Sequence, residues 1–229
     1  MFSRILNLIR GKHLGQTDPI HSALERLKAK TTPFKFLQVG SSDGDLNDPL
    51  RQYIESKNAI GIFVEPLASS LDKIRERYVG FGGLAFINCA VDSIPGQRTL
   101  YQISNDDSSL PEWAYQVASF DRQVLLNHAH AIKDVAARIT ETVVPCRTIE
   151  CILLEHSVDA LDCMQIDTEG HDYEILKTFP FKALKPKLVI YEHKHLSPAD
   201  FSSSKEFLIN HGYRIIAGHN DVVASFVKR

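Results

Sequence analysis

The sequence predicts an α/β protein built on a doubly wound, mostly parallel sheet, with an antiparallel hairpin at the C-terminal edge. Short and almost wholly apolar runs alternate with segments of helical spacing, as expected for strands that are covered on both faces. The last two runs are separated only by Gly218-His-Asn-Asp221, which is a turn rather than a crossover helix. The length of 229 residues fits one such domain with additions.

The first half of the chain predicts an N-terminal helix followed by three strands that are joined by two helices. A helix should begin at Asp18–Pro19, within an N-terminal helical extension that we place at residues 1–34. Asp48–Pro49 repeats this helix-start pattern, and Leu71, Ile74 and Tyr78 mark the buried face of the next helix. This order of elements requires parallel pairing through right-handed crossovers. The expected strands are 36–39, 60–64 and 84–91.

The second half predicts an interruption followed by a return to the same pattern. A short strand at 99–103 should pair back through Pro95–Gly96. Apolar spacing from Trp113 to Ile139 predicts one long helix, or two that break near Asn127. We interpret residues 110–140 as a helical insertion that acts as a lid over the site. The remaining predicted strands are 142–147, 163–166, 188–191, 213–216 and 222–227, with helices at 149–155, 171–177 and from Ser197.

Composition narrows the class of protein. The net charge is −2 and no long basic run occurs, so we expect no nucleic-acid partner. Four cysteines without C-x-x-C spacing indicate neither a zinc site nor a disulfide framework, and they fit a cytoplasmic location. We expect no transmembrane segment. The apolar start, Met1 to Arg10, is short and interrupted by arginine, so we expect it to pack on its own domain or on a second copy rather than on a membrane.

Polar residues follow the predicted strands where each strand ends. In an open parallel sheet, ligands bind beyond the carboxyl ends of the strands, near the point where strand order reverses. The sequence therefore predicts a ligand site at that edge of the sheet. The segments concerned are Gly40-Ser-Ser-Asp-Gly44, Glu65, Ala90-Val-Asp92, Asp167-Thr-Glu169 and Glu192-His193.

The glycine loop after the first strand and Glu65 indicate the class of ligand. Glycines let the backbone turn tightly and let a ligand approach it closely. Glu65 follows about twenty residues later, where an acid can accept both hydroxyl protons of a ribose. The loop lacks the middle glycine of a nicotinamide fingerprint, Asp43 would repel a pyrophosphate, and no phosphate-loop motif for ATP occurs. A cationic ligand such as S-adenosylmethionine, with its ammonium and sulfonium, fits better.

Three segments in this order resemble the FkbM family of S-adenosylmethionine-dependent methyltransferases: Val39-Gly-Ser-Ser-Asp-Gly44, Phe63-Val-Glu65-Pro66 and Ile166-Asp-Thr-Glu-Gly-His-Asp-Tyr-Glu-Ile-Leu176. The resemblance runs from about Phe36 to His193. It implies a Rossmann-like seven-stranded sheet and methyl transfer, usually to a hydroxyl oxygen of a small molecule or sugar. Where family members often have I-G-A-N-x-G and L-K-I-D, this chain has V-G-S-S-D-G and M-Q-I-D. Both departures keep the glycine and acid positions, so they bear on the substrate more than on the cofactor.

The resemblance also implies roles for individual residues. Glu65 would hold the ribose of the cofactor, and Asp167, Glu169 and His193 are the candidate bases that would deprotonate the acceptor. His193 has the most suitable unperturbed pKa, about 6.5. We expect the methionine part of the cofactor at Gly40, Ser41, Asp43 and Gly44, the adenine at Ala90 and Val91, and a serine-containing loop near the cofactor at Ser108 and Ser109, which could equally cap a helix.

We expect no required metal, although Asp167, Glu169 and Glu192 offer oxygen ligands of the kind that divalent ions bind. Two other functions stay open at this point. The chain could be an S-adenosylmethionine-binding module without chemistry, although binding alone does not need the acids beyond the cofactor loop. It could also be a nucleotide-sugar glycosyltransferase, for which Asn105-Asp-Asp107 is a poor metal-binding motif because no strand precedes it.

Overall fold

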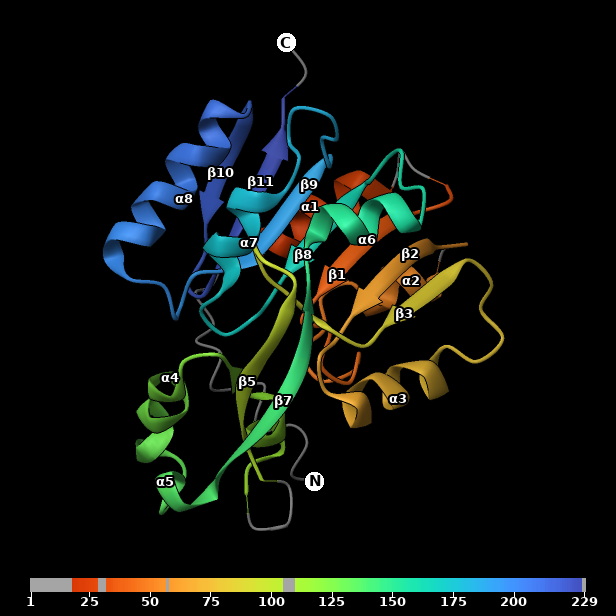
Figure 1. The fold of residues 1–229 in the computed structure, drawn as a ribbon. Coiled ribbons are helices and arrows are strands. Elements are labelled where there is room, and N and C mark those ends of the chain that lie inside the picture. The colour runs from red at the N-terminus through yellow and green to blue at the C-terminus, as the bar shows by residue number, and fades with distance from the viewer. Residues whose placement is uncertain (1–17, 29–31, 57, 105–109, 228–229) are drawn as a thin grey trace.

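The computed structural model describes residues 18–28, 32–56, 58–104 and 110–227. The main sheet contains seven strands: β1 (Lys35–Val39), β2 (Ile60–Val64), β3 (Leu84–Ile87), β8 (Cys163–Ile166), β9 (Leu188–Glu192), β10 (Tyr213–Ala217) and β11 (Asp221–Phe226). Their order is β10-β11-β9-β8-β1-β2-β3 (Figure 1). From β9 to β3 all neighbours are parallel, whereas β11 runs antiparallel to both β9 and β10. The predicted mostly parallel, Rossmann-like sheet with an antiparallel edge hairpin is therefore confirmed.

Helices cover both faces of this sheet because the strand side chains alternate between two apolar layers. Phe36 packs in one buried cluster with Ile54, whereas Leu37 and Val39 pack in the other with Leu176. Both clusters are almost fully buried, which explains why the strands are apolar throughout. On the first face lie α1 (Pro19–Lys28), α2 (Arg51–Ser56) and α3 (Ala68–Arg77), and on the second lie α6 (Ile149–Glu155), α7 (Asp172–Thr178) and α8 (Pro198–Asn210).

A second sheet lies beside the first and was not predicted. Its order is β4-β7-β5-β6, and β5 pairs with β7 in antiparallel register from Gly96–Cys146 to Ile103–Ile139. In Figure 1 these two long strands extend away from the main sheet toward α4 and α5. The bounds are β4 (Ala90–Val91), β5 (Gly96–Ile103), β6 (Ala118–Ser119), β7 (Ile139–Arg147), α4 (Arg122–Leu126) and α5 (Val135–Arg138).

The strand predicted at 84–91 is two strands in different sheets. β3 ends at Ile87, and β4 begins at Ala90 and pairs with β7 instead. Asn88, between them, donates from Nδ2 to the backbone carbonyls of Glu65 (3.0 Å) and Pro66 (2.9 Å). These bonds bend the chain out of the main sheet at the point where the second sheet begins.

The helix predicted from Trp113 to Ile139 is replaced by several short elements. Between Pro111 and β7 the chain forms a 3₁₀ turn, the short strand β6, α4, a second 3₁₀ turn and α5; the 3₁₀ turns are η2 (Glu112–Gln116) and η3 (Asn127–His130). The apolar residues in this stretch have helical spacing, but they pack around Ile103 of β5 in a cluster of their own. That cluster, rather than one continuous helix, accounts for the apolar pattern.

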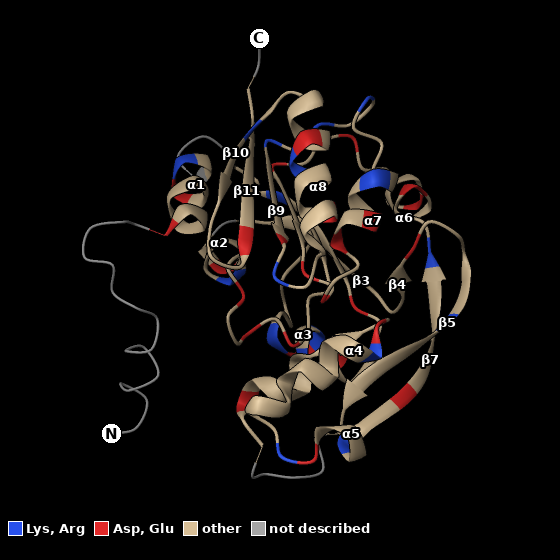
Figure 2. Cartoon of the chain, turned by 90° about the vertical axis from the view of Figure 1, so that its left-hand side faces the viewer, with Lys and Arg blue, Asp and Glu red and all other residues tan. Residues whose placement is uncertain are grey.

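Four remaining sequence expectations concern membrane-spanning segments, the distribution of charge, the cysteines and the apolar start of the chain. No helix within the described ranges is long and apolar enough to span a membrane. Basic and acidic residues are distributed over many elements of both sheets (Figure 2). The four cysteines carry free thiols. Residues 1–17, which include the apolar start, lie outside the described residues.

Candidate active site

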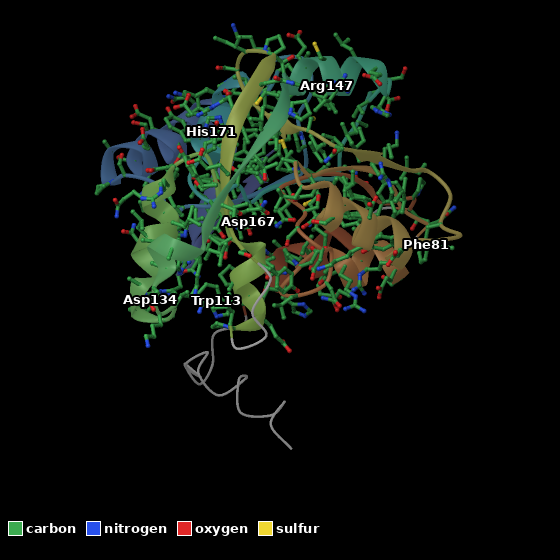
Figure 3. The ribbon with its side chains drawn as sticks, turned by 60° about the horizontal axis from the view of Figure 1, so that its bottom comes forward. Phe81, Trp113, Asp134, Arg147, Asp167 and His171 are labelled. Atoms are coloured by element: carbon green, nitrogen blue, oxygen red, sulfur yellow. The ribbon has the colours of Figure 1, made fainter. Side chains whose placement is uncertain are left out.

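A cavity of about 1160 Å³ opens at the carboxyl ends of the parallel strands. It lies where strand order reverses between β1 and β8, the predicted location for a ligand. Its volume is slightly above the range of ordinary small-molecule pockets, about 300–1,000 Å³, so it has room for more than one small molecule. Asp167, at the end of β8, lies near the middle of the molecule, whereas Phe81, Asp134 and Arg147 lie toward its periphery (Figure 3).

Gly40 closes the first strand in a position that only glycine fits. Its φ is +76°, and a Cβ there would lie 1.8 Å from the backbone oxygen of Asp167. Its N–H donates to the carbonyl of Val64 at 2.9 Å. Gly40 therefore joins the ends of three neighbouring strands, and with Ser41 it lines the cavity.

Glu65, at the end of β2, is 4% exposed and lines the same cavity. Its two carboxylate oxygens accept hydrogen bonds from the backbone N–H groups of Ser42 (2.8 Å) and Leu67 (2.9 Å). Burial raises the pKa of Glu65 to about 7, despite these two hydrogen bonds. Each oxygen keeps a further lone pair, so the group can accept hydroxyl protons when it is charged.

Asp43 and Gly44 do not line the large cavity as the structure describes it. The Asp43 carboxylate accepts hydrogen bonds from Tyr115 Oη (2.7 Å), Gln116 Nε2 (3.1 Å) and the backbone N–H of Asp45 (3.0 Å). Burial opposes ionisation here, but these hydrogen bonds lower the pKa of Asp43 below its ordinary value. Asp43 therefore fastens the glycine loop to η2, a contact that the sequence did not reveal.

The expected adenine position is also in the cavity wall. Ala90 and Val91 of β4 are buried and line it, together with Leu100 of β5. Ser108 and Ser109 lie outside the described residues.

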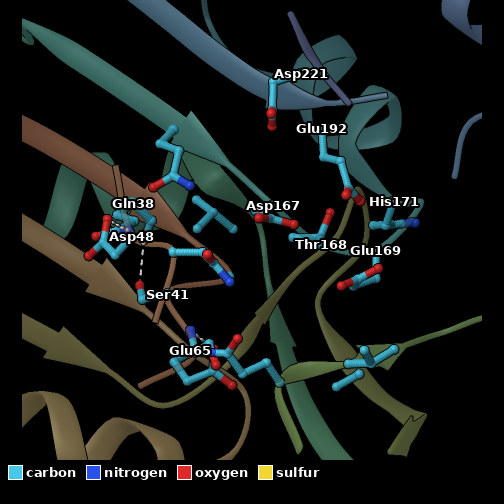
Figure 4. Close-up of a pocket in the computed structure, with 18 of the residues that line it drawn as sticks. Gln38, Ser41, Asp48, Glu65, Asp167, Thr168, Glu169, His171, Glu192 and Asp221 are labelled. Atoms are coloured by element: carbon cyan, nitrogen blue, oxygen red, sulfur yellow. Dashed lines mark hydrogen bonds between the residues drawn. The ribbon is translucent and has the colours of Figure 1, made fainter. Parts of the chain in front are cut away.

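A group of acids occupies another part of the cavity. Asp167, Glu169 and Glu192 all line it, and in the view of Figure 4 Asp167 lies between Glu65 and the other two. Burial, together with the nearby carboxylates of Glu169 and Asp172, raises the pKa of Glu192 to about 9. Burial also raises the pKa of Asp167 well above its usual range, again helped by Glu192.

Asp172, which sequence reasoning did not single out, holds this acid group in place. It is fully buried, and one carboxylate oxygen accepts from Thr168 Oγ1 (3.0 Å) and the Gly170 N–H (3.3 Å). The other accepts from the N–H of Glu192 at 3.2 Å. Asp172 thus ties the loop after β8 to the end of β9. Asp172 lies in the first turn of α7, where acidic residues are common, so the sequence alone does not indicate this role.

The structure separates His193 from the other candidate bases. Its ring stacks on Phe201 with centroids 4.2 Å apart, its Nε2 lies 3.3 Å from the carbonyl oxygen of Gly218, and it is not among the residues described as lining the cavity. The histidine that meets the acids is His195, whose Nε2 lies 2.9 Å from Glu169 Oε2. A turn closed by the N–H of Leu196 on the carbonyl of His193 brings it back toward them.

This fold and site define the class of a Rossmann-like methyltransferase, with a glycine loop after β1, an acid after β2 and further acids after β8 and β9. A family model for the methyltransferase FkbM domain matches residues 38–215. The chain therefore belongs to the FkbM family of S-adenosylmethionine-dependent methyltransferases, and its cofactor is S-adenosylmethionine. The family predicted from three short segments is confirmed.

Solved structures resemble the chain at low sequence identity. A methyltransferase FkbM from Methylobacillus flagellatus is 15% identical with a TM-score of 0.53, over 84% of this chain and 43% of that one. A precorrin-6y C5,15-methyltransferase from Geobacter metallireducens is 11% identical with a TM-score of 0.45, over 93% and 89% of the two chains. No curated protein matches the sequence.

Proposed function

We propose that the protein transfers the methyl group of S-adenosylmethionine to a hydroxyl oxygen of a small molecule or sugar. The observation that carries this proposal is one cavity of about 1160 Å³ that contains both the glycine loop with Glu65 and the acid group around Asp167. A cofactor bound along the first part leaves the second part for an acceptor, next to carboxylates that can take its proton.

The contacts above support a division of the cofactor site. Glu65 accepts the ribose hydroxyls, Gly40 and Ser41 lie against the methionine part, and Ala90 and Val91 lie against the adenine. All five line the cavity. Asp43 and Gly44 act on the methionine part through the shape of the loop, because Asp43 is already bonded to Tyr115 and Gln116.

The proposed reaction is an in-line displacement at the methyl carbon. The bond from carbon to the acceptor oxygen forms as the carbon–sulfur bond breaks, and S-adenosylhomocysteine leaves. The sulfonium is already activated, so the protein aligns the two reactants and removes the hydroxyl proton. Asp167 and Glu169 are the proposed bases because both line the cavity, whereas the ring of His193 is stacked on Phe201.

Other parts of the proposal concern the surroundings of the site. The segment 110–140 acts as a lid, supported by Trp113, Tyr115 and His128, which line the cavity. A small acceptor rather than a nucleic acid is supported by the net charge of −2. Free thiols support a cytoplasmic location.

Incubation with methyl-labelled S-adenosylmethionine and a panel of sugars and small alcohols tests the proposal. We expect label on an acceptor oxygen, with loss of transfer in Glu65→Ala. Tight binding of the cofactor in calorimetry without transfer to any acceptor would instead indicate a binding module. Transfer of label only to nitrogen or carbon would contradict the O-methylation that we propose.

A further inference from the structure

Three side-chain atoms converge at the acid end of the cavity. They are Oε2 of Glu169, in the loop after β8, Oε2 of Glu192, at the end of β9, and Nε2 of His195, three residues further along. All three residues offer ligand atoms that lie within 4.8 Å of one another. The His195 nitrogen lies 2.9 Å from the Glu169 oxygen and 4.0 Å from the Glu192 oxygen.

These three atoms are buried, and none has a hydrogen-bond partner among the described residues. Glu192 as a whole is 8% exposed, and the His195 side chain is also 8% exposed. The 2.9 Å approach between His195 and Glu169 is close enough for a hydrogen bond but lacks the required geometry. Buried polar atoms almost always have a partner, and a carboxylate that lacks one destabilises the fold. The arrangement is therefore incomplete without a further group between the three atoms.

The spacing fits a metal ion as that group. A metal bonded at about 2.1 Å to two ligands requires those ligands to lie no more than about 4.2 Å apart. The separations of 2.9 and 4.0 Å meet this requirement, and small rotations of the carboxylates bring the widest pair within it. We propose that Glu169, Glu192 and His195 form a binding site for one divalent metal ion.

The ligand set indicates which ions the site takes. Two carboxylates offset the charge of a divalent ion, and the imidazole nitrogen favours Mn²⁺, Fe²⁺ or Zn²⁺ over Mg²⁺ or Ca²⁺, which prefer oxygen alone. The sequence suggested Asp167, Glu169 and Glu192 as the alternative oxygen ligands and no required metal. The geometry replaces Asp167 with His195, which a sequence pattern could not place because it lies three residues beyond the end of β9, within a turn.

Outer contacts hold the three ligands in position, as supporting groups do at known metal sites. Ser119 Oγ donates to the carbonyl of Glu169 at 2.7 Å, where Glu169 adopts a left-handed φ of +51°. Asp172 accepts from the N–H of Glu192. A Cβ on Gly170 would lie 3.4 Å from the Cβ of His195, so the loop and the histidine pack closely. The second sheet and the main sheet thus position the site together.

The site opens toward the cavity through Glu169 and Glu192, both of which line it. Resting on the proposed function, the ion would take the acceptor's hydroxyl oxygen as a further ligand. That oxygen would then be held beside Asp167, with its proton acidified by the ion. With Glu169 bound to the ion, Asp167 would be the base that takes this proton. The acceptor class this favours is an alcohol with a second oxygen nearby, such as a vicinal diol of a sugar, because two oxygens can chelate one ion.

The test is direct metal binding to the full chain after chelator treatment. Titration with Mn²⁺, followed by electron paramagnetic resonance of the free ion, should show one bound ion per chain, and Zn²⁺ in calorimetry should compete for it. Glu192→Gln and His195→Gln should each weaken Mn²⁺ binding at least about 100-fold, the upper range for losing even a supporting group. His193→Ala is the matched control, since that ring stacks on Phe201, and it should bind Mn²⁺ like the parent.

Circular dichroism and thermal unfolding of each variant verify that it folds. Absence of Mn²⁺ and Zn²⁺ binding to the folded parent would overturn the proposal, as would folded Glu192→Gln and His195→Gln variants that bind Mn²⁺ as the parent does. Metal binding without methyl transfer would support the metal site and contradict the proposed function. Full methyl transfer in excess EDTA would contradict the contact between the metal ion and the acceptor, but it would not contradict metal binding at this site.

Discussion

At the scale of single residues, Glu65 has the most distinctive environment for binding a ribose. Its pKa of about 7 in the free protein lies above the ordinary value of 4.5, so folding favours the protonated form. The contribution of Glu65 to stability is therefore fully present below about pH 4.5 and is lost as the pH rises through 7. The proposed ribose binding should have the opposite dependence, because the charged carboxylate can accept hydrogen bonds from two hydroxyl groups.

We accordingly expect S-adenosylhomocysteine to bind roughly tenfold more tightly at pH 8 than at pH 6, the ratio of charged fractions for a group with a pKa near 7. Calorimetric titration with S-adenosylhomocysteine at pH 6 and pH 8 measures this ratio of affinities. Glu65→Gln should bind weakly and lose most of this dependence, whereas Glu55→Gln, on the surface of α2, should keep it. A Glu65→Gln protein with the parent's pH profile would show that another group titrates.

Gly40 provides a second residue-scale prediction. Gly40→Ala combines a left-handed φ with a Cβ 1.8 Å from the Asp167 oxygen, whereas Gly80→Ala has a φ of +87° and nothing within 4 Å. Both changes incur the strain of about 1–2 kcal/mol for a left-handed alanine. Urea unfolding should show Gly40→Ala to be destabilised by about 2 kcal/mol more, with loss of cofactor binding. Equal destabilisation of the two variants would mean that the glycine loop after β1 can shift to accommodate the added methyl group.

At the scale of elements, the sequence predicted the main sheet because its information is local. Each strand is a short apolar run, and polar residues follow where the strand ends. The second sheet depends on pairing between β5 and β7, whose residues are up to about fifty positions apart, and no local period reports such pairing. The same reason explains the failed helix prediction at 113–139, where apolar spacing reflects packing on β5.

The site was predictable to a similar extent. Glu65 and Asp167 follow strands directly, so their place in the cavity could be inferred from the strand ends. His195 and Tyr115 reach their positions through a turn and a 3₁₀ segment, respectively. Their side-chain directions depend on tertiary contacts that have no signature in the sequence.

The contact between η2 and the glycine loop yields an element-scale prediction. Tyr115→Phe removes the hydrogen bond to the Asp43 carboxylate, worth about 1 kcal/mol at a partly exposed position, so cofactor affinity should fall about fivefold. Tyr213→Phe is the matched control, since its hydroxyl donates to the carbonyl of Pro186 in the distant hairpin. It should lower the free energy of unfolding and leave affinity unchanged in calorimetry. Equal affinity in both variants would show that η2 does not order the loop.

At the scale of the whole molecule, the cavity lies at the carboxyl ends of strands whose two faces are covered by the two apolar layers. A ligand that binds only the folded chain should therefore stabilise all of it. At a hundred times its dissociation constant, S-adenosylhomocysteine should add about 2.7 kcal/mol to the free energy of unfolding. For a chain of this size that raises Tm by roughly 5–10 °C in calorimetric melting. Gly40→Ala should show no rise, and a shift in that variant would place the ligand elsewhere.

The second sheet has a practical consequence for redesign. Gly40 and Glu65 line the cavity from the ends of main-sheet strands, whereas Trp113, Phe120 and His128 contribute to the wall from the separate stretch between β4 and α6. We therefore expect these three side chains to influence acceptor choice more than cofactor binding. We expect substitutions at those three positions to change which alcohols are methylated. The affinity of each variant for S-adenosylmethionine should stay close to that of the parent.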